Sequence, residues 1–120
     1  MLTVKECYEK MGADYEDVKE RMMTDKMIYK YNKKFLEMRE VTLLQQNLQK
    51  ADYEEAFRMA HSIKGMCLNL GYASLFEASS ALCEELRGGA PTSDLGPLLK
   101  AVTENYEKVI GCIGEMDECR

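Results

Sequence analysis

The sequence predicts a single all-α domain built as an antiparallel, up-down-up-down four-helix bundle with two short N-terminal helices. Three observations favour this fold. Apolar residues recur every three or four positions through most of the chain, as on the buried face of an amphipathic helix. No segment shows the alternating apolar and polar pattern of a strand. The 120 residues include only two prolines and can bury one modest core.

Residues 1–23 are predicted to form the two short helices, which pack across one end of the bundle as a cap. Thr3 and Glu6 form a capping box, in which each side chain accepts the backbone N–H of the other residue. The first helix therefore begins there and stops at Gly12. Asp14 caps the second helix. Its apolar stripe consists of Tyr15, Val18 and Met22.

The bundle is predicted to occupy residues 25–115 of the single domain 1–120. Its first helix is a long one, from about Asp25 to Gln49. The expected buried stripe of this helix is Ile28, Tyr31, Phe35, Met38, Leu44 and Leu48. The second helix begins at Asp52, which with Glu55 forms its N-terminal cap, and ends at Gly71.

The third helix is predicted to begin at a capping box of Ser74 and Glu77 and to end at Gly88 and Gly89. Residues 90–94 form the clearest loop. The last helix has an apolar stripe of Leu98, Leu99, Val102, Tyr106, Val109, Ile110 and Ile113. Because the connections are short, neighbouring helices are expected to run in opposite directions.

Charge and hydropathy exclude several functional classes. The net charge of −5, with basic and acidic residues interspersed, argues against a nucleic-acid-binding protein. Charged residues interrupt the N-terminus within ten positions, unlike a secretory signal. No run approaches the roughly 20 apolar residues that a membrane span needs. We therefore expect a cytoplasmic protein, and the initial methionine is consistent with a complete small chain.

The cysteine pattern argues against a metal site or a disulfide framework. The five cysteines form an odd set with wide, irregular gaps, and there is only one histidine. No CxxC pair or Cys/His cluster has the spacing of metal ligands. We expect them to be reduced and mainly to fill space in the core. They are Cys7, Cys67, Cys83, Cys112 and Cys119.

The single histidine, His61, is predicted to face away from the core. On a helical wheel, the apolar residues of 52–71 gather roughly 140–240° from it. These residues are Ala56, Met59, Ile63, Met66, Cys67 and Leu70. An isolated surface histidine usually has no function, so its neighbours decide the interpretation.

The neighbours of His61 suit a reactive group that a partner must approach. Gly65 lies one turn later on the same face, although glycine inside a helix costs about 1 kcal/mol relative to alanine. The missing side chain would clear the approach to the imidazole. Lys64 offers a mobile ammonium group for a phosphate. Phe57 and Leu68 flank this patch as an apolar rim, which favours partner docking.

Residues 60–71 read AHSIKGMCLNLG and resemble the signature of histidine-containing phosphotransfer (HPt) domains, AHxLKGxxxNLG. The helix with Leu75, Leu82 and residues 83–87 also resembles the helix that pairs with it in that family. The resemblance covers roughly residues 25–115. Ile63 replaces the commoner leucine, and the two short N-terminal helices lie outside the common family core.

The resemblance implies that His61 is the phosphoacceptor, which attacks an acyl phosphate through an imidazole nitrogen. Neutral imidazole is a suitable nucleophile near pH 7. By the same resemblance, Lys64 helps to neutralise the phosphoryl oxygens, and Gly65 leaves room for the incoming partner. The expected docking residues are Phe57, Arg58, Leu68 and Asn69. Asn69 has a second interpretation, as a residue that hydrogen-bonds near the helix end.

The implied protein is a phosphocarrier and not a self-sufficient kinase. It relays phosphoryl groups between receiver-domain aspartates, or from a kinase to a receiver. The chain has no Gly-rich nucleotide loop, so the receiver partner is expected to supply Mg²⁺ and its acidic pocket. The expected partners are response-regulator receiver domains and a hybrid histidine kinase, with no nucleic acid and no membrane. The protein is expected to be a monomer.

Two alternatives remain at this point. A histidine-kinase dimerisation domain also presents a histidine on a helical bundle, but there an acidic residue normally follows the histidine, whereas Ser62 follows His61. The second alternative is a non-catalytic helical adaptor or regulatory protein that binds a signalling partner and whose histidine is incidental.

Overall fold

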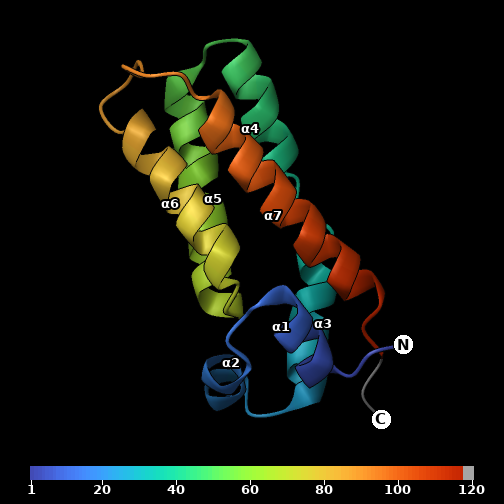
Figure 1. Ribbon diagram of the computed structural model, residues 1–120. Helices are drawn as coiled ribbons and strands as arrows, with labels where there is room; N and C mark the ends of the chain where they lie inside the picture. The colour runs from blue at the N-terminus through green and yellow to red at the C-terminus, as the bar shows by residue number, and fades with distance from the viewer. Residues whose placement is uncertain (118–120) are drawn as a thin grey trace.

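The computed structural model describes residues 1–117, and within this range the protein is all-helical, as predicted. No helix within residues 1–117 is long and apolar enough to cross a membrane. The only extended pairing in this part of the chain is an isolated bridge between Leu2 and Met116. The helices are α1 (Val4–Met11), α2 (Tyr15–Met22), α3 (Asp25–Phe35), α4 (Glu40–Gln49), α5 (Tyr53–Leu70), α6 (Ala73–Leu86) and α7 (Gly96–Gly114) (Figure 1).

The ends of α1 and α2 follow the sequence signals. The Glu6 N–H donates to Thr3 Oγ1 at 3.1 Å, and the Thr3 N–H donates to Glu6 Oε1 at 2.9 Å, which completes the predicted capping box. Gly12 ends α1 in the left-handed conformation, with φ of 69°. Asp14 caps α2 by accepting the Asp17 N–H at 3.1 Å.

The predicted long helix from Asp25 to Gln49 is wrong, because the chain breaks it into α3 and α4. On one continuous helix, Phe35 and Leu44 would point about 180° apart, yet both are buried. The turn at residues 36–39 reorients the chain so that both side chains reach the core. The stripe also differs at one position, since Tyr31 is 36% exposed and Asn32 is fully buried instead.

The capping box predicted at Ser74 and Glu77 is also wrong. Helix α6 begins one residue before Ser74, and its N-cap residue is Tyr72, with no side-chain cap hydrogen bond. Tyr72 is 2% exposed, so burial of its ring fixes where α6 begins. The far end differs less, since α6 ends at Leu86, just before the two glycines at 88 and 89.

Helices α4, α5, α6 and α7 lie side by side around a shared core (Figure 1). Each of them contacts the next along the chain, and α4 also contacts α7. The connections α4–α5 and α5–α6 are short, whereas residues 87–95 form a longer loop before α7.

Helices α1, α2 and α3 gather at the lower end of the molecule in Figure 1. Helix α1 contacts α2, α3 and α7, and α3 contacts α5. The N-terminal segment is held to the end of α7, because the Leu2 N–H donates to the Glu115 carbonyl at 2.7 Å. This arrangement brings α3 against the C-terminal half of the helix that carries His61.

A buried hydrogen-bond network joins these N-terminal helices to α5. The Asn32 amide donates to the Tyr8 hydroxyl at 2.9 Å, and that hydroxyl donates to the Leu70 carbonyl at 2.8 Å. The Tyr72 hydroxyl donates to the amide oxygen of Asn32. Since these side chains are almost completely buried, each polar group depends on the others for its hydrogen bonds.

Candidate functional site

Both ends of α5 are fixed by local structure. At the start, Asp52 accepts the Glu55 N–H at 3.3 Å, as predicted. At the end, Gly71 has φ of 75°, and a Cβ there would lie 2.5 Å from Val18 Cγ2. Only glycine fits this position without strain. The helix therefore holds the side chains between these ends on a rigid support.

His61 lies on the exposed face of α5, as the helical wheel predicted. The Phe57 ring stacks beside it, with the centroids 6.1 Å apart and the planes 14° apart. The guanidinium carbon of Arg87 lies 5.4 Å from the centre of the Phe57 ring. Within residues 1–117 no hydrogen bond engages the imidazole, so packing orients the ring and both nitrogens are open to a reactant.

Lys64 and Gly65 lie next to this imidazole. The Lys64 ammonium is 5.9 Å from the centre of the Phe76 ring on α6, and no carboxylate in the described part of the chain forms an ion pair with it. A Cβ added at Gly65 would have no atom within 4 Å. The site thus combines a free cation with open space one turn from His61.

The residues predicted for docking differ in how free they are. Leu68 is 64% exposed, and Phe57 is half-buried. Arg58 is exposed, but its guanidinium is paired with Glu54 at 3.1 Å and with Glu55 at 2.6 Å. This pairing leaves Arg58 less available to a partner than the sequence suggested.

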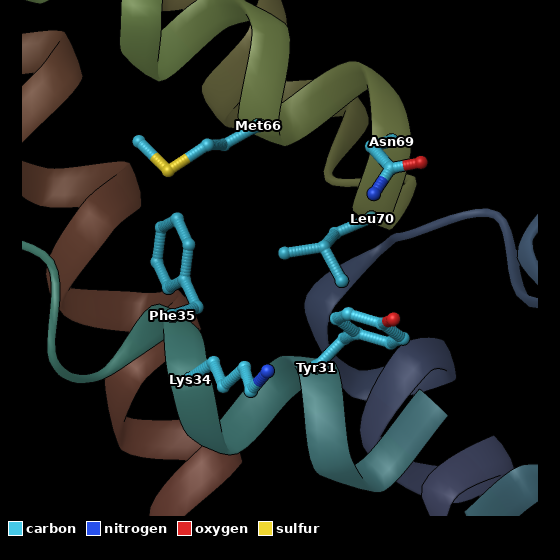
Figure 2. Close-up of a pocket in the computed structure, with 6 residues that line it drawn as sticks. All are labelled: Tyr31, Lys34, Phe35, Met66, Asn69 and Leu70. Carbon is cyan, nitrogen blue, oxygen red and sulfur yellow. The ribbon is translucent and has the colours of Figure 1, made fainter. Parts of the chain in front are cut away.

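Asn69 is exposed near the end of α5. Its backbone carbonyl accepts a hydrogen bond from Arg21 Nη2 at 2.6 Å, and the Leu68 carbonyl accepts from the same nitrogen at 3.1 Å. No cap bond from the Asn69 side chain occurs within residues 1–117. The side chain instead lines a groove (Figure 2).

Two side chains of α6 and its C-cap complete the site, and sequence reasoning missed both of them. Phe76 lies against Lys64, and Arg87 lies against Phe57. Glu84 pairs with Arg87 at 2.8 Å, and this guanidinium lowers the pKa of the Glu84 carboxyl. A wheel of α5 alone cannot reveal these contacts, because they depend on how α6 packs against it.

The described cysteines do not form a reactive or metal-binding centre. Four of them are buried and free, and burial raises the pKa of the Cys67 thiol to about 12 and that of Cys7 to about 11. Such thiols stay protonated at neutral pH. Among residues 1–117 no three histidine, cysteine, aspartate or glutamate side chains are placed to hold a metal. Cys119 lies outside the described residues.

Comparison with known proteins gives one match. A family model described as "Hpt domain" matches residues 37–110, which is more than half of the chain and includes His61. The matched segment runs from the turn before α4 into α7 and leaves out α1, α2 and α3. No curated protein and no solved structure matches the chain.

Proposed function

We propose, starting from the fact that the chain belongs to the Hpt domain family, that His61 carries phosphoryl groups between signalling partners. Hpt domains act in histidine phosphotransfer in two-component signalling, where they interact with receiver domains and kinases. The observation that carries the assignment to His61 is its exposed imidazole, with Gly65 open beside it and no ion pair to Lys64 among residues 1–117. The protein is then a phosphocarrier in a phosphorelay.

We also interpret α4, α5, α6 and α7 as the antiparallel four-helix bundle of this family. The contacts around the ring of four helices and the two short connections support this interpretation. In such a bundle the core faces of the other three helices hold α5 from behind. His61 is therefore displayed on a surface that does not need to move when a partner arrives.

The proposed reaction begins with a receiver domain phosphorylated on an aspartate. A neutral nitrogen of the His61 ring attacks the phosphorus, and the new N–P bond forms as the bond to the aspartate oxygen breaks. The aspartate leaves as a carboxylate on the receiver. The phosphorylated ring is then an imidazolium, which loses its remaining N–H proton to water. The forward transfer to a second receiver reverses these steps.

The neighbouring residues have separate tasks in this reaction. Lys64 places a positive charge near the three phosphoryl oxygens once they are on His61. Gly65 leaves space for the receiver surface to come within bonding distance of the ring nitrogen. Phe57, with Arg87 over its ring, stacks beside the imidazole and favours an orientation parallel to its own plane. Positioning of this kind contributes strongly to phosphoryl transfer.

The remaining chemistry is assigned to the partner. The receiver domain is proposed to supply Mg²⁺ with its acidic pocket, which neutralises charge on the moving phosphoryl group. No nucleotide-binding loop occurs in the sequence. We therefore propose that the upstream donor is a receiver or a hybrid histidine kinase, that the chain works as a cytoplasmic monomer, and that it does not phosphorylate itself from ATP.

The test is phosphoryl transfer from a labelled, phosphorylated receiver domain. The wild-type protein is expected to gain a label that is stable in base and labile in acid, as phosphohistidine is. The His61→Ala variant is expected to fold normally and to gain no label, because no other histidine is present. If the wild-type protein gained no label from any receiver, the result would favour the adaptor alternative, in which the histidine is incidental.

A further inference from the structure

We propose that the Ser80 hydroxyl on α6 binds the phosphoryl group while His61 carries it. This inference rests on the proposed function and adds a hydrogen-bond donor to the phosphoryl site, besides the charge of Lys64. A phosphoryl group has three strong acceptor oxygens. Ser80 would donate to one of them, in the phosphorylated protein only, and would therefore favour the phosphorylated state of His61.

The Ser80 hydroxyl lacks a hydrogen-bond partner in the protein. Its oxygen is buried, and no donor or acceptor within residues 1–117 bonds to it. Such groups are uncommon in folded proteins, because a buried polar atom without a partner is unfavourable. Since Ser80 as a whole is only half-buried, rotation about its single side-chain torsion turns the oxygen toward the surface without any change in the backbone. The hydroxyl is thus free to bond a group that arrives from outside.

Ser80 belongs to the face of α6 that is turned toward α5, the helix beside it (Figure 1). It lies four residues after Phe76 and seven before Arg87, spacings that place all three residues on one side of a helix. The Phe76 ring contacts Lys64 of α5, and the Arg87 guanidinium contacts Phe57 of α5. Ser80, between these two contacts, therefore faces α5 as well.

His61 lies at nearly the same height along the two helices as Ser80. The contact between Lys64 and Phe76 marks a level at which the helices meet. From that level His61 is three residues back along α5, about 4.5 Å, and Ser80 is four residues onward along α6, about 6 Å. Both steps lead the same way, toward the second contact of the two helices. A phosphoryl group on the His61 ring would therefore lie beside Ser80.

The surroundings of Ser80 suit an anion. Burial raises the pKa of the Cys83 thiol, three residues after Ser80, and the nearby cations of Lys64 and Arg87 act in the opposite direction. Both positive charges therefore reach this part of the contact between α5 and α6. No carboxylate within residues 1–117 forms an ion pair with Lys64. A phosphoryl group here would meet one cation and one hydroxyl, and a hydrogen bond to a charged acceptor is stronger than one between neutral groups.

Ser79 provides a matched control for Ser80. Its hydroxyl also lacks a partner within residues 1–117, but Ser79 is fully buried among the core residues. Each serine is changed to alanine, the protein is mixed with a labelled, phosphorylated receiver, and the label on each protein is measured at equilibrium. Ser80→Ala should lower the equilibrium constant for phosphorylation of His61 by about three- to tenfold, because only the phosphorylated state loses a hydrogen bond. Ser79→Ala should change it by less than about twofold.

Two further variants separate the hydroxyl from the shape of the side chain. Ser80→Thr keeps a hydroxyl, whereas Ser80→Val has nearly the same shape as threonine and has none. Ser80→Thr should stay within about twofold of the wild-type equilibrium constant, and Ser80→Val should match Ser80→Ala. The ³¹P resonance of phosphorylated His61 should shift in Ser80→Val and stay in place in Ser79→Ala. Circular dichroism checks that every variant is folded. Equal behaviour of Ser80→Thr and Ser80→Val would overturn the inference.

The possible results separate the inference from the proposed function. If the wild-type protein accepts no phosphoryl group from any receiver, the proposed function fails and the inference fails with it. If the wild type accepts phosphoryl groups and Ser80→Ala has the same equilibrium constant, only the inference is overturned. If Ser79→Ala lowers the equilibrium constant as much as Ser80→Ala does, the two hydroxyls act through the fold of α6, which also overturns it.

Discussion

The middle and the C-terminal end of α5 differ in the hydrogen bonds that they make with the rest of the protein. In the middle, His61 has no hydrogen bond within residues 1–117, and Gly65 has open space around it. At the end, the Leu70 carbonyl accepts the Tyr8 hydroxyl at 2.8 Å, and the Gly71 carbonyl accepts the Asp14 N–H at 3.0 Å. The middle of α5 presents open positions to a partner, whereas the backbone carbonyls at its end are bonded to the protein's own N-terminal segment.

This difference indicates how one helix serves two purposes. Substitutions at the exposed positions His61 and Gly65 in the middle of α5 should alter function and leave the fold intact, because neither position contributes to the core. Substitutions at the end should alter stability first, since buried polar groups would lose their partners there. This distinction would be wrong if a substitution at an exposed position in the middle of α5 destabilised the fold. It would also be wrong if a substitution at the end of α5 abolished transfer and left stability unchanged.

Gly65 in α5 and Gly71 at its C-cap should differ most in how their substitution affects phosphoryl transfer and stability. Gly65→Gln should reduce transfer by roughly a hundredfold or more, because the added side chain keeps the receiver from the imidazole. Its free energy of unfolding should rise slightly, by up to about 1 kcal/mol, since glycine is a poor helix former. Transfer is measured with the phosphorylated receiver, and stability by urea unfolding followed with circular dichroism.

Gly71→Ala is the matched control and should do the opposite. The new Cβ would lie 2.5 Å from Val18 Cγ2, at a backbone φ of 75°. Steric crowding and the left-handed conformation together should lower the free energy of unfolding by about 2–4 kcal/mol. Transfer below the unfolding temperature should be nearly normal. Loss of helical structure in Gly65→Gln, or a stable Gly71→Ala, would contradict the comparison.

Asn32 should be the most sensitive polar residue of the anchored region. Asn32→Ala removes three buried hydrogen bonds, to Tyr8, to the Ile28 carbonyl and from Tyr72. The free energy of unfolding should fall by about 2–4 kcal/mol, because two tyrosine hydroxyls lose a partner. Denaturant unfolding measures the loss.

A second asparagine separates this network from an ordinary helical hydrogen bond. Asn105 donates to the Ala101 carbonyl at 2.8 Å, just as Asn32 donates to the carbonyl four residues before it. Asn105 is only half-buried and bonds no tyrosine within residues 1–117. Asn105→Ala should therefore cost less than about 1 kcal/mol, part of it offset by the better helix propensity of alanine. Equal losses for the two variants would show that the tyrosines add nothing.

Lys64 should give the smallest effect. Lys64→Ala should slow transfer, or shorten the lifetime of phosphorylated His61, by up to about fivefold, because an exposed ion pair is worth at most about 1 kcal/mol. Lys108→Ala, an exposed lysine on α7, should have no effect on either quantity. Decay of the acid-labile label is followed for both proteins. A normal rate and lifetime for Lys64→Ala would remove this residue from the site.

Local sequence signals located those features that depend on residues near one another in the chain. The capping box at Thr3 and Glu6, the N-cap at Asp52 and the helix stop at Gly71 all occur where the sequence places them. The exposed position of His61 followed from helical periodicity alone. The spacing of His61, Lys64 and Gly65 also led to the family, which the match over residues 37–110 confirms.

Errors occurred where packing between distant residues decides the local structure. The break between α3 and α4 depends on burying Phe35 and Leu44 together, which periodicity within one helix cannot predict. The start of α6 depends on the burial of Tyr72, which overrides a plausible capping pattern. In both places the core selects a backbone conformation that local propensity does not favour.

The sequence by itself therefore determined the helical class, the family and the orientation of His61 on its helix, because each depends on spacing within a short segment. Only the tertiary structure decided that Phe76 and Arg87 complete the site and that α3 forms a groove with α5. These contacts join residues far apart in the chain. Their geometry depends on how the helices pack, which no single-helix pattern specifies.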